Sequence, residues 1–276
     1  MLAAVSLAWK WQLGLARATA VVSIIAAVVG VVVAAIGNAT NLSLPLSAVI
    51  VWTVTLAVAA GITAFRFYRD PERIPPSRDD VVLSPADGTI LYVHEVMGAE
   101  LPVVAKNGRP YRLEELTKTT LHDSDATVIG IGLNFLDVHV NRAPIAGRIT
   151  LQERFPGRFG SLRKPAMIFE NERATIVIER GELQVALVLI ASRLVRRIVL
   201  FLKSGEEVAL GQRIGAIRFG SQADIVIPAR DGLRVVVQPG DSAIAGDTVL
   251  AHFVPQSHAL AGASGASRRG VSSAGA

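Results

Sequence analysis

The chain has 276 residues, of which 51% are hydrophobic, and it carries a formal net charge of +5 with no cysteine. The lack of cysteine excludes a disulfide framework, a thiol nucleophile and metal sites with Cys ligands. The basic residues are scattered rather than gathered with aromatic side chains, so anionic lipid headgroups are a simpler partner than nucleic acid.

The first predicted element is a hairpin of two membrane-spanning helices, residues 18–66. Residues 18–65 contain no Asp, Glu, Lys, Arg or His, and about 20 apolar residues cross a bilayer. Two such segments, 18–36 and 46–65, flank the polar turn "GNATNLSLP". Basic residues at both outer ends predict that residues 1–17 and the chain after the hairpin lie on the cytoplasmic side of the cell membrane. A cleaved signal peptide is the weaker alternative, because a second span follows directly.

A connector and a β-rich region follow the hairpin. Residues 66–80, rich in proline and charge, are predicted to be extended at the membrane surface. Up to about Val254, short β-branched runs alternate with turn signals, with a helix predicted at 113–118 and a hairpin turn at Asn107-Gly108. This pattern predicts a mainly β fold of sandwich or barrel type. The Ala-, Ser- and Gly-rich residues 255–276 are predicted to be a disordered tail.

One weak internal repeat stands near the end of the β region. The segment "FLKSGEEVALGQRIGAI" from Phe201 is similar to "VVQPGDSAIAGDTVLAH" from Val236, with aligned glycines. Two copies are too few for a solenoid. They predict two similar hairpins of the hammerhead kind found in biotinyl and lipoyl domains.

Taken one at a time, the polar residues of this region carry weak signals. Asp87 in "SPADG" fits an ordinary turn, and His139, between two valines, fits a half-buried strand histidine. The histidines show no metal-ligand spacing, and no helix start follows the glycines of "GIGLNF", which disfavours a dinucleotide site. Ser221 follows Gly220, but Ala223 replaces the second glycine of a GxSxG elbow, which disfavours a conventional serine hydrolase.

The order of six segments changes this interpretation. The chain contains, in sequence, "FRFYRDPERIPP", "VVLSPADGTI", "FLDVHVNRAPIAGRI", "NERATIVIE", "RRIVLFL" and "LGQRIGAIRFGSQADIVIP". Together they resemble the phosphatidylserine decarboxylase proenzymes, in particular their short bacterial and archaeal branch. The resemblance covers most of the chain outside the hairpin and the tail, so residues 67–254 are predicted to be the catalytic domain.

The resemblance implies a membrane-bound carboxy-lyase that uses a pyruvoyl group, with neither a metal nor pyridoxal phosphate. It implies that the Ser221 hydroxyl attacks the carbonyl of Gly220, a glycine that tolerates a distorted backbone. Elimination would then split the proenzyme into a β chain, 1–220, and an α chain that begins with the pyruvoyl group made from Ser221. A Schiff base between that group and phosphatidylserine would release carbon dioxide and leave phosphatidylethanolamine.

The resemblance also implies roles for three further residues. Asp87 matches the aspartate of a Ser/His/Asp arrangement for self-cleavage. His139 matches the first of two histidines in the better-known bacterial branch, and Arg142 stands at the second position. His139 is therefore expected to act as cleavage base, as decarboxylation proton donor, or as both. Arg142 stays protonated and is no base, but it could bind the substrate phosphate or carboxylate.

Two alternatives stay open at this point. The same reaction could act on another serine-headed lipid, such as archaetidylserine. A non-catalytic, membrane-anchored module of the lipoyl type is disfavoured, because "RFGSQAD" lacks the carrier lysine and Lys203 lacks its usual surroundings. A homodimer is compatible with the sequence but not specified by it.

Overall fold

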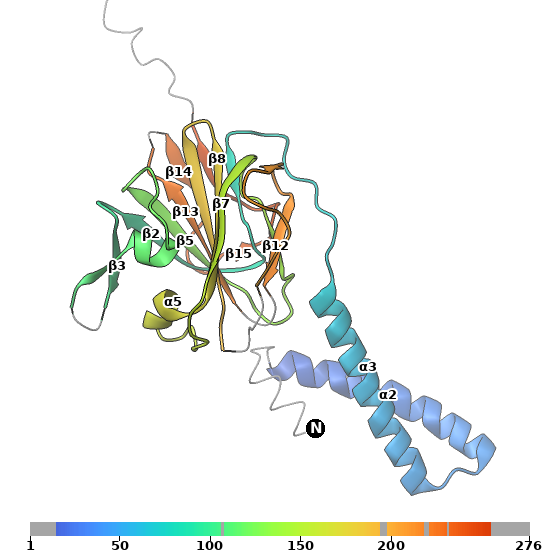
Figure 1. The fold of residues 1–276 in the computed structure, drawn as a ribbon. Helices are drawn as coiled ribbons and strands as arrows, with labels where there is room; N and C mark the ends of the chain where they lie inside the picture. Colours follow the sequence, from blue (N-terminus) through green and yellow to red (C-terminus); the bar gives the residue numbers. More distant parts are fainter. Residues whose placement is uncertain (1–14, 106–107, 194–197, 218–220, 231, 255–276) are drawn as a thin grey trace, which may run out of the picture.

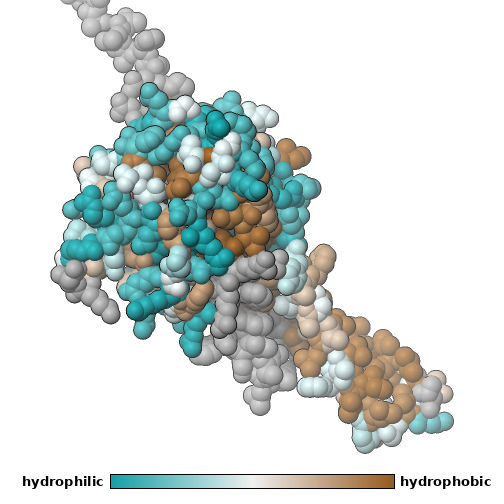
Figure 2. Space-filling view, in the orientation of Figure 1, coloured by the Kyte–Doolittle hydropathy of each residue, from teal (hydrophilic) through white to brown (hydrophobic). Residues whose placement is uncertain are grey.

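Two long helices project away from the β domain in the computed structural model, which describes residues 15–105, 108–193, 198–217, 221–230 and 232–254 (Figure 1). They are α2 (Leu15–Thr40) and α3 (Leu44–Tyr68), packed side by side. Both are long and apolar enough to cross a membrane, and only 6% of each span is buried within the structure. Figure 2 shows their outer surface as hydrophobic, in contrast to the largely hydrophilic β domain. This exposure fits helices embedded in lipid and not the core helices of a soluble protein.

The turn between the helices is shorter than the sequence predicts. α2 continues through Gly37 to Thr40 and α3 begins at Leu44, so only residues 41–43 remain as the turn. Asn41 takes the left-handed conformation there, with φ 55°. Pro45 lies in the first turn of α3, where the missing N–H costs no hydrogen bond. The predicted turn of 37–45 is therefore too long at both ends: residues 37–40 belong to α2, and residues 44 and 45 belong to α3.

The remainder of the described chain is mainly β, as predicted. A large antiparallel sheet has the order β11 (Glu207–Val208), β7 (Gly147–Phe155), β8 (Arg173–Arg180), β9 (Leu183–Ile190), β13 (Gln222–Pro228), β5 (Ala126–Gly132), β2 (Gly88–Val96) and β15 (Ser242–Ala243). Two three-stranded sheets are β1 (Val81–Leu83) with β16 (Val249–Phe253) and β14 (Leu233–Val235), and β10 (Ile198–Leu200) with β12 (Arg213–Ile217) and β6 (Val140–Arg142).

Short elements complete the fold. β3 (Glu100–Val104) and β4 (Pro110–Arg112) form a hairpin, and the predicted helix is α4 (Leu113–Thr117). Of the predicted turn, Gly108 has φ 82° and Asn107 lies outside the described residues. A second short helix, α5 (Ala166–Glu170), was not predicted. The predicted tail lies outside the described residues.

The large sheet is buried on both faces. Its first face packs against the two three-stranded sheets, through residues such as Ile131, Leu187 and Ile225. Its second face packs against the β3–β4 hairpin, α4 and α5, through residues such as Val128 and Val188. Because both faces are covered, β9 and β13 are buried at every position, which explains the apolar runs at residues 185–190 and 225–228.

The two copies of the internal repeat adopt matching conformations. Gly205 and Gly240 have φ of 94° and 98°, and Gly211 and Gly246 have φ of 71° and 72°. The N–H of Gly205 donates to β7 and that of Gly240 donates to β2, so the copies lie at opposite edges of the large sheet. The sequence thus identified two similar turns, and the likeness to biotinyl and lipoyl domains stays a prediction.

Candidate active site

The connector that follows α3 is fastened to the β domain by ion pairs. The guanidinium of Arg213, on β12, contacts Asp70 at 2.6 Å and Glu72 at 2.8 Å. In Figure 1 the connector runs from the end of α3 along the side of the β domain. These contacts fix where the helical hairpin meets the domain.

Arg142, the predicted substrate-binding residue, also holds the connector. Its Nη1 donates to the carbonyl of Gly211 at 3.0 Å, and its Nη2 donates to the carbonyl of Pro71 at 3.0 Å. Nη2 also lies 3.4 Å from a carboxylate oxygen of Asp70, and the side chain is only 4% exposed. The structure therefore gives Arg142 a positioning role, and its binding of substrate stays a prediction without support from these contacts.

Asp87 lies in the tight turn between β1 and β2 and is held by a second connector arginine. Arg73 donates to both carboxylate oxygens of Asp87, at 2.6 and 2.8 Å, and the Ala245 N–H donates at 2.8 Å. The turn leaves no room for a side chain at Gly88, where a Cβ would lie 2.2 Å from the Gly132 carbonyl oxygen. Asp87 is thus fixed in position, with a nearly buried arginine as its partner.

His139 is buried directly before β6, and its ring contacts the end of the membrane hairpin. Its residue exposure is 3%, and its ring centroid lies 4.5 Å from that of Phe67, near the end of α3. Neither ring nitrogen has a hydrogen-bond partner among the described residues. Burial lowers the pKa of His139 to about 4; the nearby backbone of Asp137 and the charge of Asp87 oppose this shift, and the charge of Arg69 adds to it. The imidazole is therefore neutral at pH 7, as a proton acceptor must be.

Ser221 immediately precedes β13, and its residue exposure is 4%. Its Oγ has no hydrogen-bond partner among the described residues. The Leu133 N–H donates to the Ser221 carbonyl at 2.9 Å, and the Ile217 N–H donates to the His139 carbonyl at 3.0 Å. The segment from 217 to 221 and the loop 133–139 are therefore tied together at both ends. Gly220, the other half of the predicted cleavage site, lies outside the described residues.

The loop opposite Ser221 contains a carboxyl group that the sequence did not single out. Asp137 is half-buried and accepts a hydrogen bond from the Asn134 N–H at 2.7 Å. Burial raises the pKa of Asp137, the charge of Asp87 acts in the same direction, and Arg69 opposes it. The charge of Asp87 is thus close enough to act on the ionisation of both His139 and Asp137.

The structure brings the predicted residues together only in part. Asp87 and His139 are coupled by charge, and His139 is linked to Ser221 through the paired loops. No hydrogen bond joins Asp87, His139 and Ser221 within the described residues, so their action as a triad stays a prediction. The missed residues Phe67, Arg69 and Arg73 all lie in "FRFYRDPER", whose mixture of aromatic and basic residues was the available signal.

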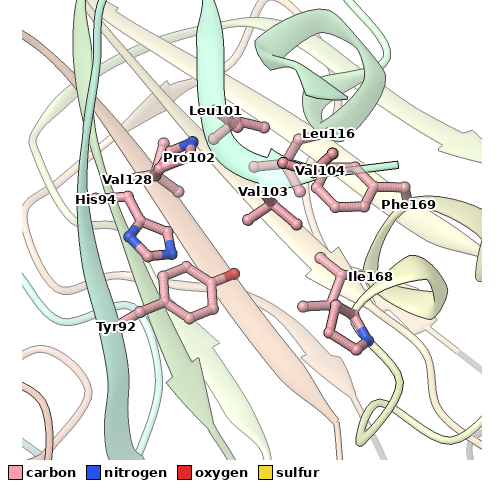
Figure 3. Close-up of a pocket in the computed structure, with 11 residues that line it drawn as sticks. Tyr92, His94, Leu101, Pro102, Val103, Val104, Leu116, Val128, Ile168 and Phe169 are labelled. Atoms are coloured by element: carbon pink, nitrogen blue, oxygen red, sulfur yellow. The ribbon is translucent and has the colours of Figure 1, made fainter. Parts of the chain in front are cut away.

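A polar network lies on the opposite face of the sheet from Ser221. Gln222 donates to Tyr92 Oη and to Asp224, both at 2.7 Å, and Tyr92 Oη donates to Asp224 at 2.7 Å. Burial raises the pKa of Asp224 to about 6. Figure 3 shows Tyr92 and His94 at one side of an adjoining pocket of about 410 Å³, whose other lining residues are apolar.

The structure shows no cluster of three or more metal-ligating side chains in its described parts.

The pairing of Asp87 with Arg73 predicts a large effect on stability. Asp87→Ala would leave the nearly buried guanidinium unpaired, and we expect a loss of about 3–5 kcal/mol in the free energy of unfolding. The double variant with Arg73→Ala should lose less than the sum of the two single variants. Denaturant unfolding of unprocessed Ser221→Ala protein measures both values. Asp80→Ala removes an exposed pair with Arg78 and should cost at most about 1 kcal/mol; an equal loss at both sites would contradict the prediction.

Comparison with known proteins identifies the family of the chain. The family model described as "Phosphatidylserine decarboxylase" matches residues 61–251. A phosphatidylserine decarboxylase proenzyme of Mycolicibacterium gilvum is 41% identical over 73% of the chain and 79% of its own length, and one of Erythrobacter litoralis is 40% identical over 73% and 76%. A Methanothermobacter thermautotrophicus protein, provisionally named an archaetidylserine decarboxylase proenzyme, is 38% identical over 69% and 80%. The chain belongs to the phosphatidylserine decarboxylase family.

Proposed function

We propose that the chain is a membrane-bound proenzyme that splits itself between Gly220 and Ser221 and then decarboxylates phosphatidylserine. The observation that carries the proposal is the environment of Ser221. Its Oγ is buried without a hydrogen-bond partner among the described residues, and its segment is tied to the loop that ends at a neutral, buried histidine. A buried hydroxyl without a partner is costly and therefore typical of a functional group.

The self-cleavage needs only groups of this chain and water. Ser221 Oγ attacks the carbonyl carbon of Gly220, its proton passes to a base, and the Gly220–Ser221 C–N bond breaks as the Ser221 amine is freed. The product is an ester between Gly220 and Ser221. Loss of the Ser221 Cα proton then breaks the Cβ–O bond, which leaves a Gly220 carboxylate and dehydroalanine. Addition of water releases ammonia and completes the pyruvoyl group.

The residues around Ser221 fit such a group. Ser221 has the same orientation along β13 as Ala223, whose side chain lies in the first core, so the group would form in a largely dry environment. The pyruvoyl group supplies an electron sink for the electrons that the departing carboxyl leaves behind. The chain's own tasks are to orient the lipid headgroup, to exclude water and to move a proton at that position.

The position of the helical hairpin supports a lipid substrate. A diacyl lipid remains in its membrane, so its headgroup must be met at the bilayer surface. The end of α3 reaches the site itself, because Phe67 packs on the His139 ring. We infer that the hairpin anchors the domain on the cytoplasmic side, where the basic residues at its outer ends would be retained.

Two measurements on the purified full-length protein test the proposal. Intact mass should show two fragments, residues 1–220 and 221–276, with the second blocked to Edman sequencing. Vesicles of phosphatidylserine labelled in the carboxyl group should release labelled carbon dioxide. A single unbroken chain without carbon dioxide release would overturn the proposal. The archaeal relative motivates a parallel assay with archaetidylserine. Faster release of carbon dioxide from that lipid than from phosphatidylserine would make it the preferred substrate.

A further inference from the structure

The arginines around the connector differ in whether their charge is already neutralised. Arg73 is paired with Asp87, and Arg213 is paired with Asp70 and Glu72. Arg142 is buried against two backbone carbonyls and Asp70. All three guanidinium groups contact a carboxylate within the protein, although the buried Nε of Arg142 has no hydrogen-bond partner among the described residues.

Arg69, in the connector itself, differs from these three arginines because it contacts no carboxylate of the described residues. It follows α3 directly as the C-cap residue, and it is half-exposed. Its Nη1 donates to the Arg66 carbonyl at 3.1 Å, and no carboxylate of the described residues lies within ion-pair distance of it. This hydrogen bond uses one of the five N–H donors and leaves the other four available for an anion.

The charge of Arg69 acts on the candidate active site. It lowers the pKa of both His139 and Asp137, so it lies within electrostatic reach of the loop opposite Ser221. Its neighbour Phe67 packs on the His139 ring. Arg69 therefore lies two residues after the aromatic side chain that packs on the buried histidine, at the end of α3 where the hairpin meets the β domain.

The reaction indicates which part of the headgroup such a charge should bind. During decarboxylation the negative charge leaves the carboxyl group, so a cation on that carboxylate would stabilise the substrate more than the transition state and slow the reaction. The phosphate keeps its charge throughout and is retained in the product. An arginine fork also matches phosphate oxygens geometrically.

We propose that Arg69 binds the phosphate of the lipid headgroup and so aligns the serine moiety with Ser221. The proposal rests on the proposed function, and it makes Arg69 a substrate-binding residue. It assigns to Arg69 the contact that the sequence suggested for Arg142. Arg66 provides a matched control, because its side chain is exposed one turn earlier on α3 and its charge does not act on His139 or Asp137.

The test uses full-length processed protein in detergent micelles. With dihexanoyl phosphatidylserine, Arg69→Gln should raise KM by about 10- to 100-fold, the usual effect of losing a hydrogen bond between charged groups. Arg66→Gln should leave KM unchanged. Hexyl serine ether, which has the amino acid but no phosphate, should react equally with the wild-type protein and with Arg69→Gln.

Product binding gives a readout apart from turnover. By calorimetry, Arg69→Gln should weaken the binding of dihexanoyl phosphatidylethanolamine by a similar factor, and Arg69→Lys should restore part of it. If Arg69→Gln affects both substrates equally, or matches Arg66→Gln, the phosphate assignment is wrong. An unsplit wild-type chain would instead overturn the proposed function, so the two failures are distinguishable.

Discussion

Ser221→Ala is expected to leave one unbroken chain of 276 residues that releases no carbon dioxide from phosphatidylserine. Alanine has no Oγ to attack Gly220, and no other atom of the chain can become the pyruvoyl carbonyl at that position. The side chain is buried and its Oγ makes no hydrogen bond among the described residues. The substitution should therefore not destabilise the protein, which intact mass and circular dichroism can establish together. Ser242→Ala, at an exposed position on β15, should split normally.

An ester trap separates self-cleavage by Ser221 from cleavage by a contaminating protease. Neutral hydroxylamine added during processing should capture the Gly220–Ser221 ester and release residues 221–276 with a free serine at the start, readable by Edman sequencing. Without hydroxylamine the same fragment should be blocked. A free serine in both conditions would show hydrolysis in place of elimination and would contradict the formation of the pyruvoyl group.

Periodicity and turn chemistry in the sequence predicted much of the β domain. The apolar runs at residues 185–190 of β9 and 225–228 of β13 were recognised as strands from their β-branched residues. Both faces of the large sheet are covered there, so these runs show no polar alternation. The aligned glycines of the internal repeat predicted matching turns, because their positive φ favours glycine. The hairpin turn was misplaced, since Gly37 and Asn38 can also extend a helix that continues to Thr40.

The site was harder to predict, because its contacts join distant segments. Asp87 and His139 were named from the order of motifs, but nothing in the sequence indicates that Asp87 is paired with Arg73 rather than with His139. Likewise, Arg142 looked available for a ligand until the structure placed it against Gly211 and Pro71. Which arginine pairs with which group depends on the path of the connector. The connector has no hydrophobic periodicity from which that path could be predicted.

The environment of His139 favours the role of base in self-cleavage. Its pKa of about 4 leaves it almost entirely neutral at pH 7, so it can accept the Ser221 proton but is rarely protonated enough to donate one. We expect His139→Gln to slow splitting of the proenzyme by about 10²- to 10⁴-fold, the usual contribution of a general base. His94→Gln, at a half-buried histidine on β2 beside the pocket of Figure 3, should split at the wild-type rate. Normal splitting of His139→Gln with loss of decarboxylation would assign His139 to the later step instead.

The pH dependence of splitting tests the same assignment. The folded pKa of His139 lies below the usual value of 6.5, so the base form dominates at neutral pH. The rate constant should be constant from pH 8 to about pH 6 and should fall at lower pH with a midpoint near 4. Unfolding takes up a proton at His139, so stability also declines as the pH falls from about 6.5 towards 4. Proenzyme made by cell-free translation into nanodiscs and shifted to each pH gives the rate, and circular dichroism of Ser221→Ala at the same pH values shows whether the fold persists. A midpoint near 6.5 with the fold intact would mean that His139 is solvated in the proenzyme and that burial does not set its basicity.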